Sequence, residues 1–274
     1  MLQLLLVPMK YIVFLTFILC PLSCYSQKDS TIFIADYIVK YQDCEEDDTL
    51  LTDIFRLKVG ERYVHYFSNK YNYYHTMKMG GELDNDALDY KAVIKGLPKG
   101  LSSCGYWIMK DLEKRKMMFE IRFDTAYEED IPIINWQLED VDSVICEHVC
   151  HKANATFRGR MWHAWYTLDI PSSEGPWKLN GLPGLILYAY DSKGQFYFDC
   201  ICLKEGKGYP INYNRKRLKF ASPKRVQDLY LLERSDEDDY YLKMAGWVMG
   251  ERFDKNGNPE KFMPKTRCLL DYIE

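Results

Sequence analysis

Apolar and polar residues alternate along much of the chain, which is the pattern of β-strands that are buried on one face. Charged or glycine-containing segments separate these stretches, as expected for hairpin connections. One stretch departs from the alternation, because residues 84–95 predict a short helix that ends at Gly96. The alternation itself predicts strands at residues 32–41, 51–59, 62–67, 117–123 and 143–146.

The clearest local element is a hairpin. An apolar stretch at 185–190 is followed by a polar turn from Asp191 to Gly194 and by a second strand at 195–203. Aspartate at the start and glycine at the end provide the usual turn chemistry. Since side chains alternate between the two faces of a strand, one face of the second strand is predicted to be buried. That face carries Phe196, Phe198, Cys200 and Cys202.

A helix is predicted near 223–234, where Ser222 can cap the N-terminus and Pro223 can occupy the first helical position. The acidic run at 235–239 interrupts or ends this helix. Aromatic residues make up 15% of the chain and fit a pleated, half-buried surface. The fold class is therefore predicted to be mainly β: an antiparallel curved sheet, open barrel or sandwich, with a minor helical part.

Residues 1–26 have the features of a secretory signal peptide. Lys10 precedes an apolar run at 11–19, and the small residues Cys24 and Ser26 stand at −3 and −1 of a cleavage site before Gln27. The apolar run is too short to span a membrane. We therefore expect an exported protein, periplasmic or secreted, with no transmembrane span in its mature chain; either Met1 or Met9 is its start.

Lipid attachment at Cys20 or Cys24 is the alternative interpretation of the N-terminus, although the residues before each cysteine fit a lipoprotein signal poorly. No repeat or linker divides the remainder, so residues 27–274 are predicted to form a single domain. The mature chain would keep an odd number of cysteines, whose pairing the sequence does not determine. They are Cys44, Cys104, Cys146, Cys150, Cys200, Cys202 and Cys268.

The overall charge argues against a nucleic-acid partner. The chain has 36 basic and 40 acidic residues, and a dedicated nucleic-acid binder normally carries a strong basic excess. The motifs of nucleotide-binding loops, zinc proteases and serine hydrolases are also absent from the sequence. No cofactor is predicted from it.

A cluster of metal-capable residues stands at 146–151, where Cys146, His148, Cys150 and His151 follow one another closely. On a strand the first three would face the same side, as soft metal ligands should. However, Cys146 and Cys150 would then lie roughly 13 Å apart at Cα, too far to share an ion without a bend in the backbone. The alternative is that the cysteines are buried or disulfide-bonded and the histidines lie at the surface.

Several short motifs in order between residues 150 and 206 resemble the GLPGLI family, a group of exported Bacteroidetes proteins also described as a Porphyromonas-type family of unknown function. The matching stretches include 155–160, 164–167, 175–178 and the hexapeptide itself. The resemblance implies an extracytoplasmic bacterial protein but no activity. The hexapeptide, predicted to form a stiff turn that leads into a strand, consists of Gly181, Leu182, Pro183, Gly184, Leu185 and Ile186.

Arginines and tryptophans of this segment are the candidate ligand-binding residues. Arg158 and Arg160 flank Gly159 on a segment predicted to be extended, so both would face one side with Trp162, while Trp165 faces the other. Two guanidinium groups beside a tryptophan can hold a carboxylate or phosphate and stack on a ring. Lys178 is the remaining candidate in this set. The alternative is that these cations form ion pairs with acidic residues of the sheet.

These observations predict a non-enzymatic cell-envelope protein that binds a small or apolar ligand or a partner protein. Two alternatives remain open at this stage. One is an exported hydrolase with an unfamiliar site, and the other is a metal-handling protein that uses the 146–151 cluster.

Overall fold

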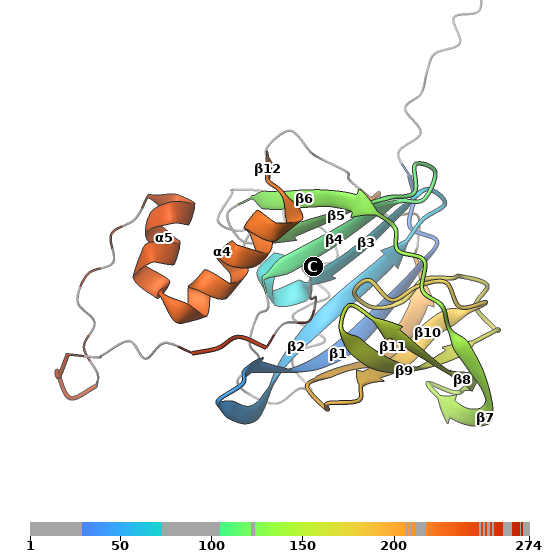
Figure 1. Cartoon of the computed structure of the whole chain (residues 1–274). Coiled ribbons are helices and arrows are strands. Elements are labelled where there is room, and N and C mark those ends of the chain that lie inside the picture. Colours follow the sequence, from blue (N-terminus) through green and yellow to red (C-terminus); the bar gives the residue numbers. More distant parts are fainter. Residues whose placement is uncertain are drawn as a thin grey trace, which may run out of the picture.

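The computed structural model describes residues 29–72, 105–121, 124–206, 208, 210–211, 218–246, 248, 250, 253, 255–259, 265–268 and 270. The predicted signal peptide and the predicted helix at 84–95 lie outside these residues. Within them the chain forms one large curved sheet with two helices of the C-terminal part beside it (Figure 1).

Twelve strands make up the sheet in the described part of the chain. Their order across it is β12-β6-β5-β4-β3-β2-β1-β11-β10-β9-β8-β7, and every neighbouring pair is antiparallel except β12 with β6. The sheet is not closed into a barrel. The bounds are β1 (Phe33–Cys44), β2 (Asp47–Val59), β3 (Tyr63–Ser68), β4 (Tyr106–Asp111), β5 (Lys116–Ile121), β6 (Thr125–Asp130), β7 (Gln137–Ile145), β8 (His148–Phe157), β9 (Arg160–Thr167), β10 (Leu185–Asp191), β11 (Phe196–Glu205) and β12 (Lys219–Phe220).

The predicted mainly-β fold class is confirmed. The alternating segments form β1, β2, β3, β5 and the end of β7, and the predicted hairpin is β10 with β11. β1 and β11 pair along their length and join the two halves of the sheet. From β6 the chain runs to β7 at the opposite edge (Figure 1), so the connection 131–136 spans the open side of the curve.

One face of the sheet, which we call the inner face, carries the main core. Its buried residues alternate along the strands, as Tyr37 and Val39 do on β1. Aromatic rings pack across the strands on this face: Phe55 stacks on Tyr66 with ring centroids 4.8 Å apart, and Tyr106 stacks on Phe119 at 5.3 Å. Such pairs add to the hydrophobic stabilisation of neighbouring strands.

The pairing of β1 with β11 corrects one prediction. Phe196, Phe198 and Cys200 are buried on the inner face as expected, but Cys202 is exposed. The register of β1 against β11 shifts between Asp36 and Tyr37, which are opposite Cys202 and Cys200. A bulge adds one residue and therefore turns the following side chains to the other face.

The predicted C-terminal helix is α4 (Pro223–Ser235), and the Ser222 hydroxyl accepts a hydrogen bond from the Arg225 N–H as an N-cap. The acidic run ends α4 and also begins a second helix, α5 (Glu237–Ala245), which Asp236 caps. Acidic residues suit the positive end of a helix dipole. Both helices pack near one end of β5 and β6, through the buried residues Val226, Leu229, Tyr240 and Met244.

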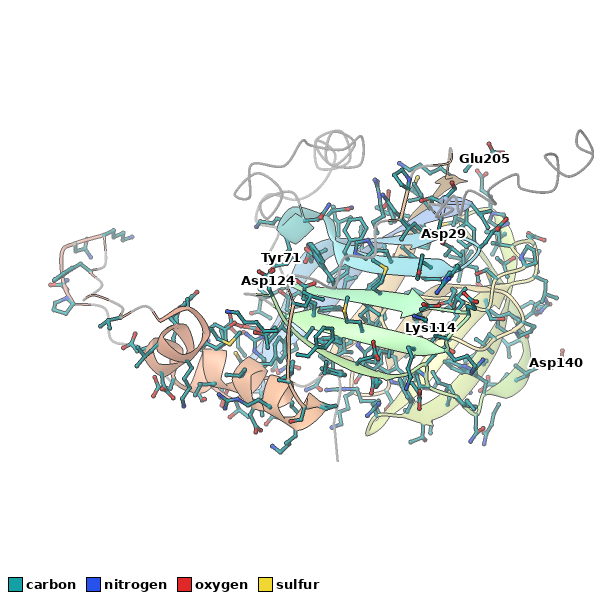
Figure 2. The ribbon with its side chains drawn as sticks, turned by 90° about the horizontal axis from the view of Figure 1, so that it is seen from above. Asp29, Tyr71, Lys114, Asp124, Asp140 and Glu205 are labelled. Carbon is teal, nitrogen blue, oxygen red and sulfur yellow. The ribbon has the colours of Figure 1, made fainter. Side chains whose placement is uncertain are left out.

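The two ends of the curved sheet therefore differ. Figure 2 shows Tyr71 and Asp124 at the end nearer the helices, and Asp29 and Lys114 at the end away from them. Asp140, on β7, marks the far edge of the sheet in the same view. We call the end beside Asp29 and Lys114 the open end of the sheet.

Candidate functional site

The connection between β9 and β10, residues 168–184, folds onto the inner face of the sheet. Trp177, Leu179 and Leu182 are completely or almost completely buried in the main core. The ring of Trp177 lies 5.4 Å from that of Trp162 on β9, centroid to centroid. The segment that carries the family resemblance therefore fills part of the curve of the sheet.

The glycines of the hexapeptide are required by close backbone contacts. A Cβ atom on Gly184 would lie 1.9 Å from the carbonyl oxygen of Thr167, so any larger residue would displace the backbone. Gly181 has a φ of 92°, which side-chain-bearing residues rarely adopt. Its N–H donates to the Ser173 carbonyl at 2.8 Å. Both physical reasons for glycine in this turn are present.

Lys178 lies at the centre of a buried polar network on the inner face. Its side chain is 0% exposed, and its ammonium donates to the Glu129 carboxylate and to the Tyr127 hydroxyl, both at 2.6 Å. The rings of Phe119 and Trp177 lie within 6 Å of the ammonium and add cation–π attraction. Lys178 thus ties the β9–β10 connection to β6 rather than facing solvent.

Arg158 binds the same carboxylate from the turn between β8 and β9. Its guanidinium donates to Glu129 at 2.6 Å, and its side chain remains 24% exposed. The sequence predicted an extended backbone here, and this is wrong: Arg158 and Gly159 have φ values of 51° and 71° and form the turn between β8 and β9. Positive φ at both positions is typical of a two-residue hairpin turn.

Arg160 is enclosed in the protein. It donates to Asp191 at 2.5 Å, both side chains of this pair are 0% exposed, and a second hydrogen bond reaches Gln195 at 2.8 Å. Asp191 in turn accepts hydrogen bonds from the backbone N–H groups of Gln195 and Phe196. Arg160 therefore stabilises the β10–β11 turn. This contact matches the alternative that the arginine forms an ion pair with an acidic residue of the sheet.

The two candidate tryptophans face opposite sides of β9, as the alternation predicts. Trp162 is completely buried in the core, and its indole N–H donates to the Phe157 carbonyl at 3.2 Å. Trp165 is half-buried on the outer face of the sheet. The structure therefore separates the candidate set: Arg160, Trp162 and Lys178 are internal, while Arg158 and Trp165 reach the surface.

The residues of the predicted metal cluster do not meet. Cys146 is in the β7–β8 turn, where its thiol lies 2.7 Å from the Cys200 carbonyl, and Cys150 is buried. His148 contacts Asp169 at 2.8 Å, and His151 contacts Asp142 at 2.6 Å. Among the described residues no three His, Cys, Asp or Glu side chains form a group that could hold an ion.

Burial disfavours the thiolate form of Cys150. It raises the pKa of this thiol to about 11, and it raises the pKa of Cys200 further. A thiolate is the form that binds metals and attacks disulfides. The environment of both residues therefore matches that of core cysteines.

A cavity of about 790 Å³ lies at the open end of the sheet. It is bounded by the β2–β3 turn at Gly60 and Glu61, the β4–β5 turn and the β6–β7 and β9–β10 connections. Most of its lining is apolar, and Ile133 at its edge is 82% exposed. The apolar side chains are Ile32, Phe33, Val59, Leu112, Ile131, Pro132, Ile133, Ile134, Ile170 and Pro171.

An ion pair stands beside this cavity. Glu174, in the lining, accepts a hydrogen bond from the Lys110 ammonium at 2.6 Å, and both side chains are at least 90% buried. Trp136 donates to the Asn180 carbonyl at 2.8 Å and holds the β6–β7 connection against the β9–β10 connection. One wall of the cavity is thus built by the β9–β10 connection together with the β6–β7 connection, which is distant in sequence.

Sequence reasoning did not identify the residues of this cavity. The only local signal was the apolar run Ile131-Pro132-Ile133-Ile134, which lies between two strands instead of within one. Four consecutive apolar residues in a connection are unusual, because connections normally run over the surface. Their assembly with residues 170–174 depends on the curvature of the sheet.

A family model described as "Protein of unknown function (Porph_ging)" matches residues 158–188. These residues run from the β8–β9 turn to β10 and include the whole hexapeptide. No match is found among curated proteins. The family match covers this segment alone, and its description assigns no activity.

Two solved structures share the fold over part of this chain. Two crystal forms of PNGF-II match 75% of this chain with a TM-score of 0.51 and identities of 10% and 11%. The chain spans about a third of the PNGF-II chains, 34% of their length. A LolA superfamily protein from Nitrosomonas europaea, NE2245, matches 70% of this chain and 91% of its own at 10% identity, with a TM-score of 0.24.

None of the described helices is long and apolar enough to cross a membrane.

Proposed function

We propose that this chain is an exported, non-enzymatic binding protein that holds a small apolar ligand in the cavity at the open end of its sheet. The observation that carries the proposal is the cavity itself. Its volume of about 790 Å³ is within the range of roughly 300–1,000 Å³ that is typical of ligand pockets. Export is supported by the signal-like pattern of residues 1–26.

The lining of the cavity suits an apolar ligand with a polar end. Apolar side chains, with isoleucine the commonest, form most of it, and burial of a ligand against them stabilises binding through the hydrophobic effect. Glu61, Arg115 and Ser173, which are exposed, provide polar groups around the same cavity. A few polar groups around an apolar pocket orient a ligand and provide specificity.

Ile133 is the residue that best reports on this site. Its side chain is 82% exposed although it is large and apolar, and it stands between Pro132 and Ile134 in the cavity wall. Contiguous exposed apolar surface marks ligand-binding or interaction sites, and Ile133 extends the apolar lining of the cavity to the surface. Since exposure means that its replacement disturbs no packing, loss of ligand binding can be separated from loss of folding.

The test is titration of the purified protein with the apolar fluorescent dye N-phenyl-1-naphthylamine. We expect saturable enhancement of fluorescence with the wild type. Ile133→Asp should weaken dye binding at least tenfold, because it places a charge against an apolar ligand. Ser173→Trp should also weaken it, since a large ring would occupy part of the cavity.

The matched control is Val144→Asp on β7. Val144 is another exposed apolar residue, at 70%, and it does not line the cavity. This variant should bind the dye as the wild type does. Absence of saturable binding to the wild type, or equal weakening by Ile133→Asp and Val144→Asp, would overturn the proposal.

A further inference from the structure

The outer face of strands β8 to β11 and β1 carries two transverse rows of directly paired residues. Each row crosses five strands, and its members are opposite one another in the register. The first row is Lys152, Trp165, Tyr188, Asp199 and Ile38, and the second row is Asn154, His163, Tyr190, Tyr197 and Lys40.

Aromatic rings occupy the centre of both rows. Tyr190 stacks on His163 at 4.9 Å, on Trp165 at 5.9 Å and on Tyr197 at 6.1 Å between ring centroids. Tyr188 lies 5.6 Å from Trp165 and 5.8 Å from Tyr190. We call these five residues the aromatic platform.

The platform faces solvent because the alternate residues of the same strands form the core. Trp162 and Ala164 on β9, Ala189 on β10 and Phe198 on β11 are buried on the inner face. The five platform residues are half-buried instead. Aromatic side chains that pack against each other yet keep part of their rings in water form a rigid contact surface.

A shallow hollow of about 210 Å³ lies at the β1 end of the platform. Its lining combines ring faces with opposite charges, from Tyr188, Tyr197, Asp199 and Lys40, and adds the aliphatic Ile38 and Leu50. At the other end of the rows, Lys152 lies over the Trp165 ring at 5.6 Å and the Asn154 amide contacts His163 at 2.5 Å. Hydrogen-bonding groups thus flank the rings on both sides.

We propose that the aromatic platform binds carbohydrate. A sugar ring has one face of electropositive C–H bonds, which pack on the negative face of an aromatic ring, and an edge of hydroxyl groups. The platform provides both partners: closely spaced, half-buried aromatic rings at the centre, and the Asp199 carboxylate and the Lys40 ammonium beside them at the β1 end. Aromatic rings on strands about 4.8 Å apart can contact successive sugars of a chain.

The composition of this surface favours carbohydrate over a protein partner. The buried centre of a protein interface is depleted of charged residues and is largely apolar. Here Lys40 and Asp199 stand next to the rings, and Ile38 is the aliphatic member of the two rows. The platform and its hollow are distinct from the cavity at the open end, because the two sites share no residue.

The test is affinity electrophoresis of the purified protein in native gels that contain a soluble β-glucan, a xylan or an α-mannan. We expect at least one of these polysaccharides to retard the wild type. Tyr190→Ser and Tyr197→Ser should each reduce the apparent affinity at least tenfold, because they remove aromatic rings from the middle of the platform. Both residues are half-buried at the surface, so circular dichroism and urea midpoints should show intact folding.

Phe253→Ser is the matched control, since Phe253 is an exposed aromatic residue, at 55%, outside the platform. It should migrate as the wild type does, and so should the cavity variant Ile133→Asp. The proposal is overturned if no polysaccharide in the panel retards the wild type. It is also overturned if the platform variants are retarded as strongly as the wild type. A third contrary outcome is that the wild type self-associates without binding polysaccharide and the platform variants abolish that self-association.

Discussion

The Lys178 ammonium and the Glu129 carboxylate meet 2.6 Å apart, although 49 residues separate them in the chain. Glu129 is on β6, and Lys178 belongs to the connection between β9 and β10. Arg158 reaches the same carboxylate from the β8–β9 turn. One carboxylate therefore connects three distant parts of the curved sheet. It holds residues 158–188, which the family model matches, at Arg158 and Lys178.

We expect Lys178→Met to lower the free energy of unfolding by about 1–3 kcal/mol, because it leaves the mostly buried Glu129 carboxylate with Arg158 as its one remaining cationic partner. Urea denaturation followed by circular dichroism measures this. Lys243→Met is the control: it removes an exposed helical ion pair with Asp239 and should cost less than about 0.5 kcal/mol. Equal costs for the two variants would contradict the buried network.

The two arginines of the motif should differ in their effect on stability. Arg160→Met breaks a fully buried pair with Asp191 and is expected to cost about 3–5 kcal/mol. Arg158→Met breaks a partly exposed pair and should cost about 1 kcal/mol. Urea midpoints of both variants measure the difference. If instead both variants fold as stably as the wild type and lose ligand binding, the arginines form the ligand clamp that the sequence suggested.

Gly184→Ala should destabilise the protein by about 1–3 kcal/mol or more, because the new Cβ would lie 1.9 Å from the Thr167 carbonyl oxygen. Thermal and urea denaturation measure this change. Gly250→Ala is the comparison, since no atom in the described part of the chain lies within 4 Å of the added Cβ. That substitution should change stability by no more than about 0.5 kcal/mol. Similar losses in both variants would show that the close contact has no special role.

His65 should make stability depend on pH. Burial of its ring, with a smaller effect of the Lys58 ammonium, lowers the pKa of the imidazole to about 3. The unfolded chain binds a proton near pH 6.5 whereas the folded protein does not. Stability is therefore complete above pH 6.5 and falls as the pH decreases from 6.5 towards 3, by up to about 1.4 kcal/mol per unit.

The measurement is a series of urea denaturations between pH 7.5 and 4.5 on the wild type and on His65→Leu. The variant lacks the titrating group, so its stability should exceed that of the wild type by an amount that grows as the pH falls. A difference between the two proteins that stays constant over this range would show that His65 does not titrate in this way.

Local signals in the sequence were sufficient for much of the fold. The alternation along β1 and the turn residues Asp191 and Gly194 involve near neighbours in the chain, and so does the Ser222 cap of α4. Their chemistry acts over a few residues, which is why they can be recognised without the fold. The exposed Cys202 was missed because a bulge opposite Asp36 shifts the register, and nothing near Cys202 indicates that bulge.

Residue patterns alone were enough to predict the mainly-β class, the β10–β11 hairpin, the C-terminal helix and the need for glycine in the hexapeptide. Three features became visible in the folded chain alone: Arg160 and Lys178 are buried in ion pairs, residues 131–134 meet 170–174 around a cavity, and rings from β9, β10 and β11 align on one surface. Each of these depends on which strands are neighbours and how far the sheet curves. Those are set by the packing of the whole core, which no short stretch of sequence contains.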